Sequence, residues 1–416
     1  MLSNYIKKQD FLALRSNFLS LSVLQFINMF LPLVTLPYLV RVIGVEFFGL
    51  VSFILSIIMY FNIIVSFGFE LSATQQISLC RDDLKKVGKI FSNVLATKLL
   101  LLIFSAIMLI GLVYSIDTLR QHSVLYFATF GVVIGNFLMP SWLFQGMENM
   151  KYITFANVMS RGIFTALIFI IVNDKSDYVY VPILNSLGAI IGGFYSIWLV
   201  FRLFKLPLIL PTRRNILHQI KYSSYFFLSR LANNGSRYYA TTIIGVCFGN
   251  LIVGYYTMAE KLFYAFNSIG SVLSQAIYPY MARTRNIVFL KKILIFTTGL
   301  SIFLLCPVMY YHDLLLDLVF NINHEILSRI FIIIFAGAIF SIVSSIIGFP
   351  LLAAFGHIRY ANYSLVYSSI IYVLYLSVFA IFKPDIYFMT LGLPIYMLSC
   401  MLFRFYYVRK TNVFIQ

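Results

Sequence analysis

The sequence predicts an all-α polytopic membrane protein with about twelve transmembrane helices in two six-helix halves. Three observations predict this fold class. The chain is 61% hydrophobic and 11% charged, with a mean hydropathy of +0.91, which is far more apolar than a typical soluble domain. Apolar runs of about 20 residues, long enough to cross a bilayer, recur along the whole sequence. Spaced pairs of glycine and proline recur about half a chain later, which indicates an internal duplication.

The apolar runs define the expected spans, and charged or turn-forming residues separate them. The first span is expected to be retained, because two prolines interrupt it and no small-residue cleavage site follows it. The expected spans are residues 17–40, 45–69, 87–113, 123–145, 152–173, 179–201, 222–245, 252–279, 293–311, 328–352, 361–382 and 386–407.

The duplication rests on two spaced pairs rather than on single residues. Gly44 and Gly49 recur 205 residues later, and Pro140 and Gly146 recur 210 residues later. Two pairs at a nearly constant offset indicate a repeat, whereas single matches would carry little weight. The predicted parts are an N-terminal six-helix bundle at 1–205, a basic cytoplasmic linker at 206–221 and a C-terminal six-helix bundle at 222–416.

The net charge of +17 is explained by its distribution along the chain. If the N-terminus is cytoplasmic, the cytoplasmic segments hold 21 lysines and arginines, and the outer loops hold five. This asymmetry follows the positive-inside rule and places both termini in the cytoplasm. The basic excess then contacts anionic membrane lipids, and no nucleic-acid partner is expected.

The residue types that usually carry catalysis or bind metal form no pattern. The four cysteines, Cys80, Cys247, Cys306 and Cys400, have no metal-binding or redox spacing. The five histidines lie in loops or at span ends and do not cluster. We therefore expect no catalytic residues, no metal site and no cofactor.

The first span carries polar side chains at helical spacing, among them Gln25 and Asn28. Such a stripe faces protein or water, so it is either a substrate surface or a packing surface. Pro32 and Pro37 remove backbone hydrogen bonds from the same helix. The helix can therefore bend near them, and both a moving hinge and a passive kink remain open.

Five basic residues lie within the predicted spans: Lys98, Arg161, Arg230, Arg237 and Lys261. A charge at the centre of a bilayer costs about 2.5–3.5 kcal/mol on insertion scales, so a chain does not carry five without use. Lys98 is close enough to a span end that we expect it to snorkel towards the interface. The others favour an anion-binding cavity.

The charged and polar residues concentrate on the seventh and eighth spans. Spacings of three, four or seven residues place Arg230, Asn233, Asn234, Arg237 and Thr241 on one face of the seventh helix. Lys261 follows on the eighth span, with Glu260 beside it. Glu260 is either the charge partner of a basic neighbour or a site of ion or proton coupling.

Three segments of the first half carry a family resemblance. They are Pro32-x4-Pro-Tyr-Leu-x-Arg-Val-x-Gly44 with Phe48-Gly49, Gly68-Phe-x-x-Ser-Ala-Thr74, and Pro140-x-Trp-x-Phe-Gln-Gly-x-Glu148 with Arg161 after it. As a set they resemble the O-antigen flippases of the polysaccharide-transporter family, in the superfamily that includes multidrug-extrusion antiporters and the lipid II flippase. The second half matches mainly by its helix pattern. Many relatives carry an acid where Ser66 stands and an arginine near Gln75, so any role of those charges is not transferred here.

The resemblance implies two six-helix bundles around a central cavity lined by spans one, two, seven and eight. It implies a transporter rather than an enzyme. Its substrate would be an oligosaccharide repeat unit on undecaprenyl diphosphate, moved from the cytoplasmic to the periplasmic leaflet of the bacterial inner membrane during lipopolysaccharide biosynthesis. A polysaccharide polymerase and a chain-length regulator are further expected partners. The energy source is left open, and a proton gradient and a sodium gradient are the two candidates.

Within this cavity, Arg230, Arg237 and Lys261 are the expected cradle for the diphosphate, because guanidinium groups bind phosphate with paired hydrogen bonds. The two arginines are seven residues apart, so we expect them to lie on one face, about 10 Å apart in depth. The alternative is that both cap carbonyls or pair with Glu260 for folding. The further candidates for substrate contact are Asn233, Asn234, Gln25, Asn28 and Arg161.

Two other functions compete with this interpretation. A multidrug or cation antiporter of the same superfamily would need acids and aromatic rings for cationic drugs, whereas the predicted cavity is net positive. A polysaccharide polymerase of the same pathway would need a large outer loop with catalytic groups. The longest outer loop here is only the short stretch around Tyr311–Arg329.

Overall fold

The computed structural model describes residues 2–382 and 384–411, and it leaves out the side chains of residues 2–22, 28, 29, 269 and 279. Within that part of the chain every regular element is a helix, which confirms the all-α prediction. The chain forms two compact units, here called unit 1 and unit 2. Unit 1 comprises residues 1–35 and 54–235, and unit 2 comprises residues 36–53 and 236–416.

The helices are long and apolar enough for a membrane protein. Nine stretches of the described residues meet the length and hydropathy that a span requires. One of them, Val23–Ser78, is 56 residues long. It includes the end of α1 (Leu2–Ser66), and Gly44 interrupts the helical geometry of α1 with φ 80° and ψ 163°. This stretch therefore contains two helices that meet at Gly44, as the predicted spans 17–40 and 45–69 require.

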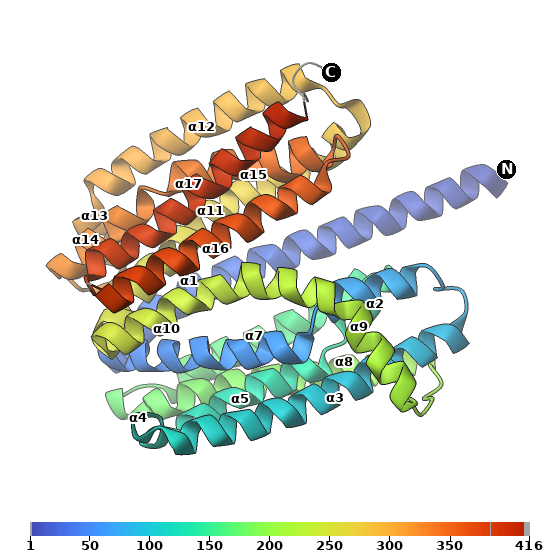
Figure 1. Cartoon of the computed structure of the whole chain (residues 1–416), viewed down its shortest axis with the longest axis horizontal. Helices are drawn as coiled ribbons and strands as arrows, with labels where there is room; N and C mark the ends of the chain where they lie inside the picture. The colour runs from blue at the N-terminus through green and yellow to red at the C-terminus, as the bar shows by residue number, and fades with distance from the viewer. Residues whose placement is uncertain (1, 383, 412–416) are drawn as a thin grey trace. The chain divides into compact units, whose positions relative to one another are not determined.

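Unit 1 is built on the packing of α5 and α8, with α7 on α8 and α3 on α5 (Figure 1). Its core contains Trp142, Phe144, Phe91 and Phe69, each no more than 2% exposed. The helices wholly in this unit are α2 (Phe69–Ser78), α3 (Leu84–Ser115), α4 (Asp117–Arg120), α5 (Ser123–Leu138), α6 (Ser141–Gly146), α7 (Met150–Ile171), the 3-10 helix η1 (Lys175–Val179), α8 (Tyr180–Phe204), α9 (Arg213–Arg230) and the π-helix η2 (Leu231–Gly235).

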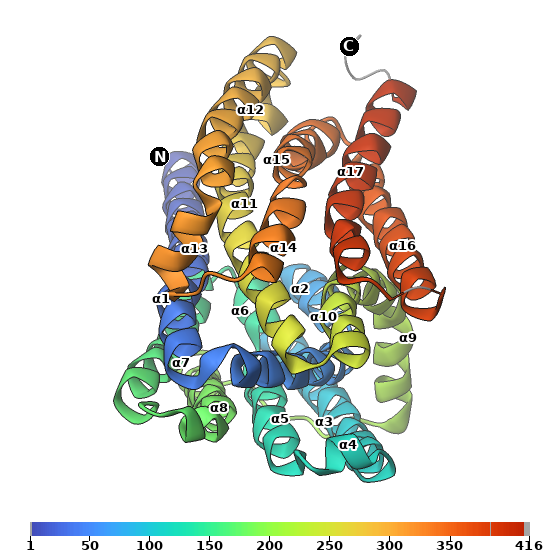
Figure 2. The same cartoon turned by 90° about the vertical axis from the view of Figure 1, so that its left-hand side faces the viewer.

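Unit 2 is organised around α11, which contacts α10, α14, α15 and η3. Figure 2 shows α16 and α17 side by side in this unit, where they pack on one another. Its helices after α1 are α10 (Ser236–Phe248), α11 (Asn250–Thr284), α12 (Ile287–Tyr310), α13 (His312–Phe320), α14 (Glu325–Phe335), α15 (Ala338–Ile346), the π-helix η3 (Ile347–Ala353), α16 (Ile358–Phe382) and α17 (Ile386–Lys410).

The unit boundaries do not follow chain order, unlike the predicted division at 206–221. The chain passes from unit 1 to unit 2 between Pro32 and Pro37, returns after Phe53, and passes again to unit 2 after Gly235. The predicted linker is already helical from Arg213, because the Thr212 side chain accepts a hydrogen bond from the Asn215 N–H at 3.3 Å and caps α9. Its role as the connection between two six-helix bundles remains a prediction.

The glycine pairs of the predicted repeat have matching geometry. Gly249 has φ 79° and ψ −177°, close to the values of Gly44. A Cβ added to Gly49 would lie 1.8 Å from the Asn250 carbonyl oxygen, and one added to Gly254 would lie 2.4 Å from the Val45 carbonyl oxygen. Val45 and Asn250 are themselves 205 residues apart. The two hairpins therefore make a reciprocal contact, which supports the duplication.

Candidate functional site

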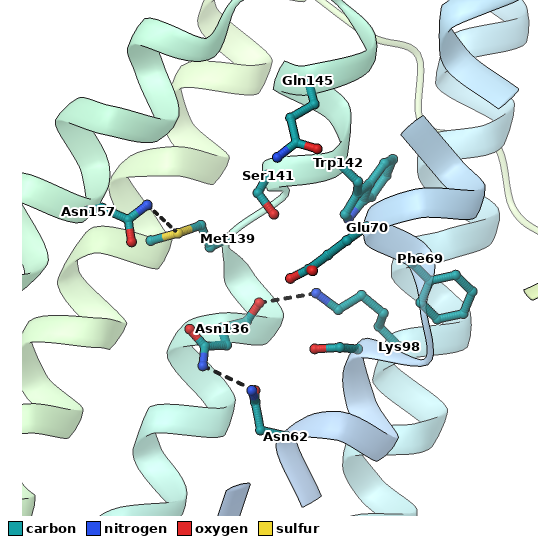
Figure 3. Close-up of a pocket in the computed structure, with 11 residues that line it drawn as sticks. Asn62, Phe69, Glu70, Lys98, Asn136, Met139, Ser141, Trp142, Gln145 and Asn157 are labelled. Carbon is teal, nitrogen blue, oxygen red and sulfur yellow. Dashed lines mark hydrogen bonds between the residues drawn. The ribbon is translucent and has the colours of Figure 1, made fainter. Parts of the chain in front are cut away.

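A polar cavity of about 270 Å³ lies within unit 1. Figure 3 shows side chains from several helices that converge on it, with the Glu70 carboxylate near its middle and Gln145, Asn157 and Asn62 around it. The lining residues are Asn62, Ser66, Phe69, Glu70, Lys98, Asn136, Met139, Ser141, Trp142, Gln145 and Asn157.

Lys98 holds one wall of the cavity together. Its ammonium donates to the carbonyl oxygens of Asn136 and Phe137, both at 3.1 Å. These carbonyls belong to the last turn of α5, which ends at Leu138 ahead of Pro140 and so leaves acceptors without helical partners. Lys98 is only 4% exposed, so the predicted snorkelling is wrong: the side chain caps a broken helix inside the unit.

Glu70 brings a negative charge into the same cavity and was not singled out in the sequence. Its carboxylate pairs with the Arg230 guanidinium at 3.1 Å, and its charge also acts on Lys98. Arg230 therefore has a carboxylate partner in unit 1, whereas Arg237 belongs to unit 2. The signal for this acid was its position in the first turn of α2, two residues after the N-cap Gly68.

The predicted polar stripe of the seventh span is not continuous. The π-helix η2 occupies residues 231–235, between α9 and α10. A π-turn carries more residues than an α-turn, so side chains before and after it do not share the face that a spacing of seven assigns. Arg230 therefore does not share the face of Arg237 and Thr241, which lie four residues apart in α10 and do share one. The Tyr60 hydroxyl donates to the Gly235 carbonyl at 3.1 Å where this turn ends.

A second charged group of residues lies within unit 2. The Arg237 guanidinium is 3.5 Å from the centre of the Tyr264 ring, and the Lys261 ammonium is 5.0 Å from the centre of the Phe48 ring. Arg237 and Lys261 are the basic groups whose charges act on the Glu260 carboxylate. Glu260 is 7% exposed and makes no ion pair among the described residues, whereas Arg237 is exposed. The structure thus brings together the three charges that the sequence placed on spans seven and eight.

Aromatic and amide groups extend this second site along unit 2. The hydroxyls of Tyr256 and Tyr372 lie 3.4 Å apart, and the rings of Tyr372 and Tyr396 are 5.5 Å apart. Asn267 lies one turn after Tyr264 and two turns after Glu260 along α11, so all three residues are on the same side of the helix. Both polar atoms of its side chain are buried without a hydrogen-bond partner among the described residues.

The other predicted site residues are distributed between the units. Arg161, on α7, has no hydrogen bond or ion pair among the described residues, and it lies one turn from the cavity residue Asn157. Gln25 is half-buried on α1, and Asn28 has a side chain that the structure does not describe. Asn233 and Asn234 lie in η2, half-buried. Pro32 and Pro37 stay within α1, so their function as a hinge remains a prediction.

A buried arginine in the last helix escaped the sequence analysis. Arg404, on α17, is 5% exposed and donates to the Ser344 hydroxyl at 3.0 Å and to the Ser364 hydroxyl at 3.2 Å. It also donates to the Ser344 carbonyl, near the start of the π-helix η3. Its position beside the chain's basic end suggested a cytoplasmic charge, but here it joins three helices of unit 2.

The described residues include no group of three or more metal-ligating side chains.

Comparison with known proteins decides the family. The polysaccharide biosynthesis protein family matches residues 14–285. The chain belongs to this family. One relative is the Escherichia coli (strain K12) protein named "Putative O-antigen transporter", which is 30% identical over 287 residues, covering 68% of this chain and 69% of its own. A Shigella dysenteriae protein of the same name is 28% identical, covering 70% of this chain and 74% of its own.

Solved structures show that this family member has a known transporter fold. The lipid II flippase MurJ in an inward closed conformation aligns with a TM-score of 0.76 at 16% identity, covering 93% of this chain and 87% of its own. An inward-facing multidrug resistance MATE transporter of the MOP superfamily aligns with a TM-score of 0.69 at 15% identity, covering 95% of this chain and 98% of its own. The identities are low, so these likenesses establish the fold alone.

Proposed function

We propose that the protein translocates undecaprenyl-diphosphate-linked oligosaccharide repeat units, such as those of O-antigen, from the cytoplasmic to the periplasmic leaflet by alternating access. The observation that carries the proposal is the charged group of unit 2: Arg237 and Lys261 against one acid, Glu260. Membership in the polysaccharide biosynthesis family and the names of its relatives support a glycan cargo.

The physical argument concerns which parts of the substrate are unfavourable in the hydrocarbon core of the bilayer. A polyprenyl tail can stay in lipid, but a diphosphate and its sugars need a polar, cationic path. Arg237 is exposed and its guanidinium is not tied to a carboxylate within the described residues, so its donors are available to phosphate. Arg230, paired with Glu70, would have to exchange that partner in order to join the cradle.

The proposal includes a topology of twelve spans in two six-helix bundles around a central cavity, with both termini in the cytoplasm of a bacterial inner membrane. The nine apolar stretches support it when Val23–Ser78 is divided at Gly44. The more polar helical segments Arg213–Phe248 and Asn250–Thr284 supply the remaining two spans. Polysaccharide polymerase and the chain-length regulator are proposed as partners in the same membrane.

A cation antiporter is the second candidate function, favoured by the buried acid among tyrosines in unit 2. Glu260, Tyr256 and Tyr264 are chemically suited to a cationic drug. However, Arg237 stacks on the Tyr264 ring that such a drug would use, and Lys261 adds a second positive charge. The geometry therefore favours an anionic headgroup.

Deletion of the gene tests the proposed function in the living cell. The expected result is that lipid-linked repeat units accumulate on the cytoplasmic leaflet, where a periplasmic glycan-modifying probe cannot reach them. Plasmid expression of the protein should restore export. Accumulation of unpolymerised units on the periplasmic leaflet would instead assign polymerase activity, and unchanged export would contradict both assignments.

Glu260 is the proposed site of coupling to a proton or sodium gradient, because it is a carboxylate 7% exposed beside two basic residues. We expect Glu260→Gln to leave the protein in the membrane while transport loses its dependence on the gradient. The measurement is flipping in proteoliposomes with and without an imposed proton or sodium gradient. If gradient dependence persists unchanged in the variant, Glu260 is only a charge partner of Arg237 and Lys261.

A further inference from the structure

The cavity of unit 1 has polar groups that the fold uses and others that it leaves free. Among those already used, Lys98 is bound to two carbonyls, and Asn136 donates to the Asn62 side-chain oxygen at 3.1 Å. The Asn157 amide nitrogen donates to the Ile153 carbonyl at 2.9 Å and contacts the Met139 sulfur at 3.5 Å. These bonds fix the wall of the cavity rather than its contents.

The free groups include both donors and acceptors. The side chains of Gln145, Ser141 and Ser66 make no hydrogen bond to any described residue. The Asn157 side-chain oxygen is also unused, and Glu70 needs only one of its carboxylate oxygens for Arg230. In Figure 3 the Gln145 amide and the Glu70 carboxylate both point into the cavity. A ligand that fills the space must therefore both donate and accept.

This mixture distinguishes between ligand classes. The cavity lining carries one cation, Lys98, and one carboxylate, Glu70, so its charges balance and favour neither a metal cation nor a phosphate. A sugar hydroxyl donates and accepts through the same oxygen, so a polyhydroxyl ring satisfies amides, hydroxyls and a carboxylate together. Sites built to hydrogen-bond a hydroxyl discriminate strongly against ligands that lack it.

We propose that the cavity of unit 1 is a monosaccharide subsite, in which Gln145, Asn157 and Glu70 hydrogen-bond the hydroxyls of one sugar ring of the glycan. The inference deepens the proposed function and rests on it. The cavity volume of about 270 Å³ lies just below the range usual for drug-sized ligands, which suits one ring rather than an oligosaccharide. Phe69 and Trp142 add an apolar wall for the C–H face of the ring.

Trp142 provides a direct readout of occupancy, because the chain has two tryptophans and the other, Trp198, is 49% exposed. The probe protein is the full chain with Trp198→Phe, held in lipid nanodiscs free of sugar-based detergent. Glucose, galactose, mannose and N-acetylglucosamine are titrated separately. At least one should change the Trp142 emission saturably, with a dissociation constant on the order of millimolar.

Substitution of the two amide side chains tests the contacts. Gln145→Ala and Asn157→Ala should each weaken that sugar by about tenfold, the effect of one hydrogen bond to a buried partner. Asn173→Ala is the matched control, because Asn173 is an exposed amide outside the cavity, and it should bind as the parent does. Thermal melting of each variant checks that the unit is intact.

Other results would overturn the subsite. One is that none of the four sugars changes the Trp142 emission. Another is that the parent and the cavity variants bind the sugar with equal affinity. A third is that pyrophosphate or sodium chloride changes the emission and the sugars do not. Failure here is separable from failure of the proposed function. Loss of sugar binding with cytoplasmic accumulation in the deletion strain removes the subsite alone, whereas sugar binding without that accumulation removes the transport assignment.

Discussion

Arg237→Ala should abolish glycan export while the protein still reaches the membrane at its normal level. Arg237 is exposed and lies 3.5 Å from the Tyr264 ring, so truncation removes a donor group without opening a packed core. A charge-assisted hydrogen bond to phosphate contributes about 1.5–3 kcal/mol, and a guanidinium supplies two of them. Loss of both lowers binding of the headgroup by a factor of about 100 or more. Surface glycan is measured by gel profile or lectin binding.

Two companion variants separate ligand binding from folding. Arg237→Lys keeps the charge but loses the paired donors, so it should retain part of the export. Arg329→Ala is the matched control, because this arginine forms an exposed ion pair with Glu325 and should be dispensable. Full export by Arg237→Ala would end the cradle proposal, and loss of folded protein in both Arg237 variants would assign the residue a structural role.

Gly49→Ala should lower the stability of the fold, although glycine-to-alanine changes in helices normally stabilise. The added Cβ would lie 1.8 Å from the Asn250 carbonyl oxygen, which belongs to backbone and cannot rotate away. The helices must separate, and overpacking of this kind costs about 1–3 kcal/mol or more. Gly254→Ala, with the Val45 carbonyl oxygen at 2.4 Å, should show the same effect. Thermal melting of the purified protein measures it.

At another glycine, Gly299, substitution by alanine is expected to change stability in the opposite direction. Gly299, within α12, has nothing within 4 Å of an added Cβ. Gly299→Ala should therefore be neutral or stabilise by about 0.5–1 kcal/mol, the usual helical preference. A melting temperature for Gly49→Ala equal to that of Gly299→Ala would show that the hairpins do not make the close contact.

The fold class, the glycine repeat and the proximity of Arg237, Glu260 and Lys261 could be predicted because each depends on a local pattern. Hydropathy reveals helices that must face lipid, and the glycine offset reveals a repeated backbone geometry that Gly44 and Gly249 share. The grouping of Arg237, Glu260 and Lys261 followed from their placement on successive spans. These predictions required no knowledge of which distant helices pack together.

The remaining features depend on distant contacts. Lys98 caps α5 only because that helix ends at Leu138, and Arg404 is buried only because Ser344 and Ser364 come to meet it. The π-turn after Arg230 shifts the helical phase, which a fixed period of 3.6 residues cannot anticipate. Helical spacing therefore assigned Arg230 and Arg237 to the same surface, although the π-turn lies between them.

The reciprocal contact of the two glycine hairpins bears on how this protein arose. Gly49 meets Asn250, and Gly254 meets Val45, so each repeat presents corresponding positions to the other. Two copies of one chain related by a two-fold axis contact one another in this way. A half-length ancestor could have used this surface to form a homodimer before gene fusion joined its subunits. In such a history the two glycines are the positions with least freedom to change, because a side chain on either one would clash with the backbone of the other repeat.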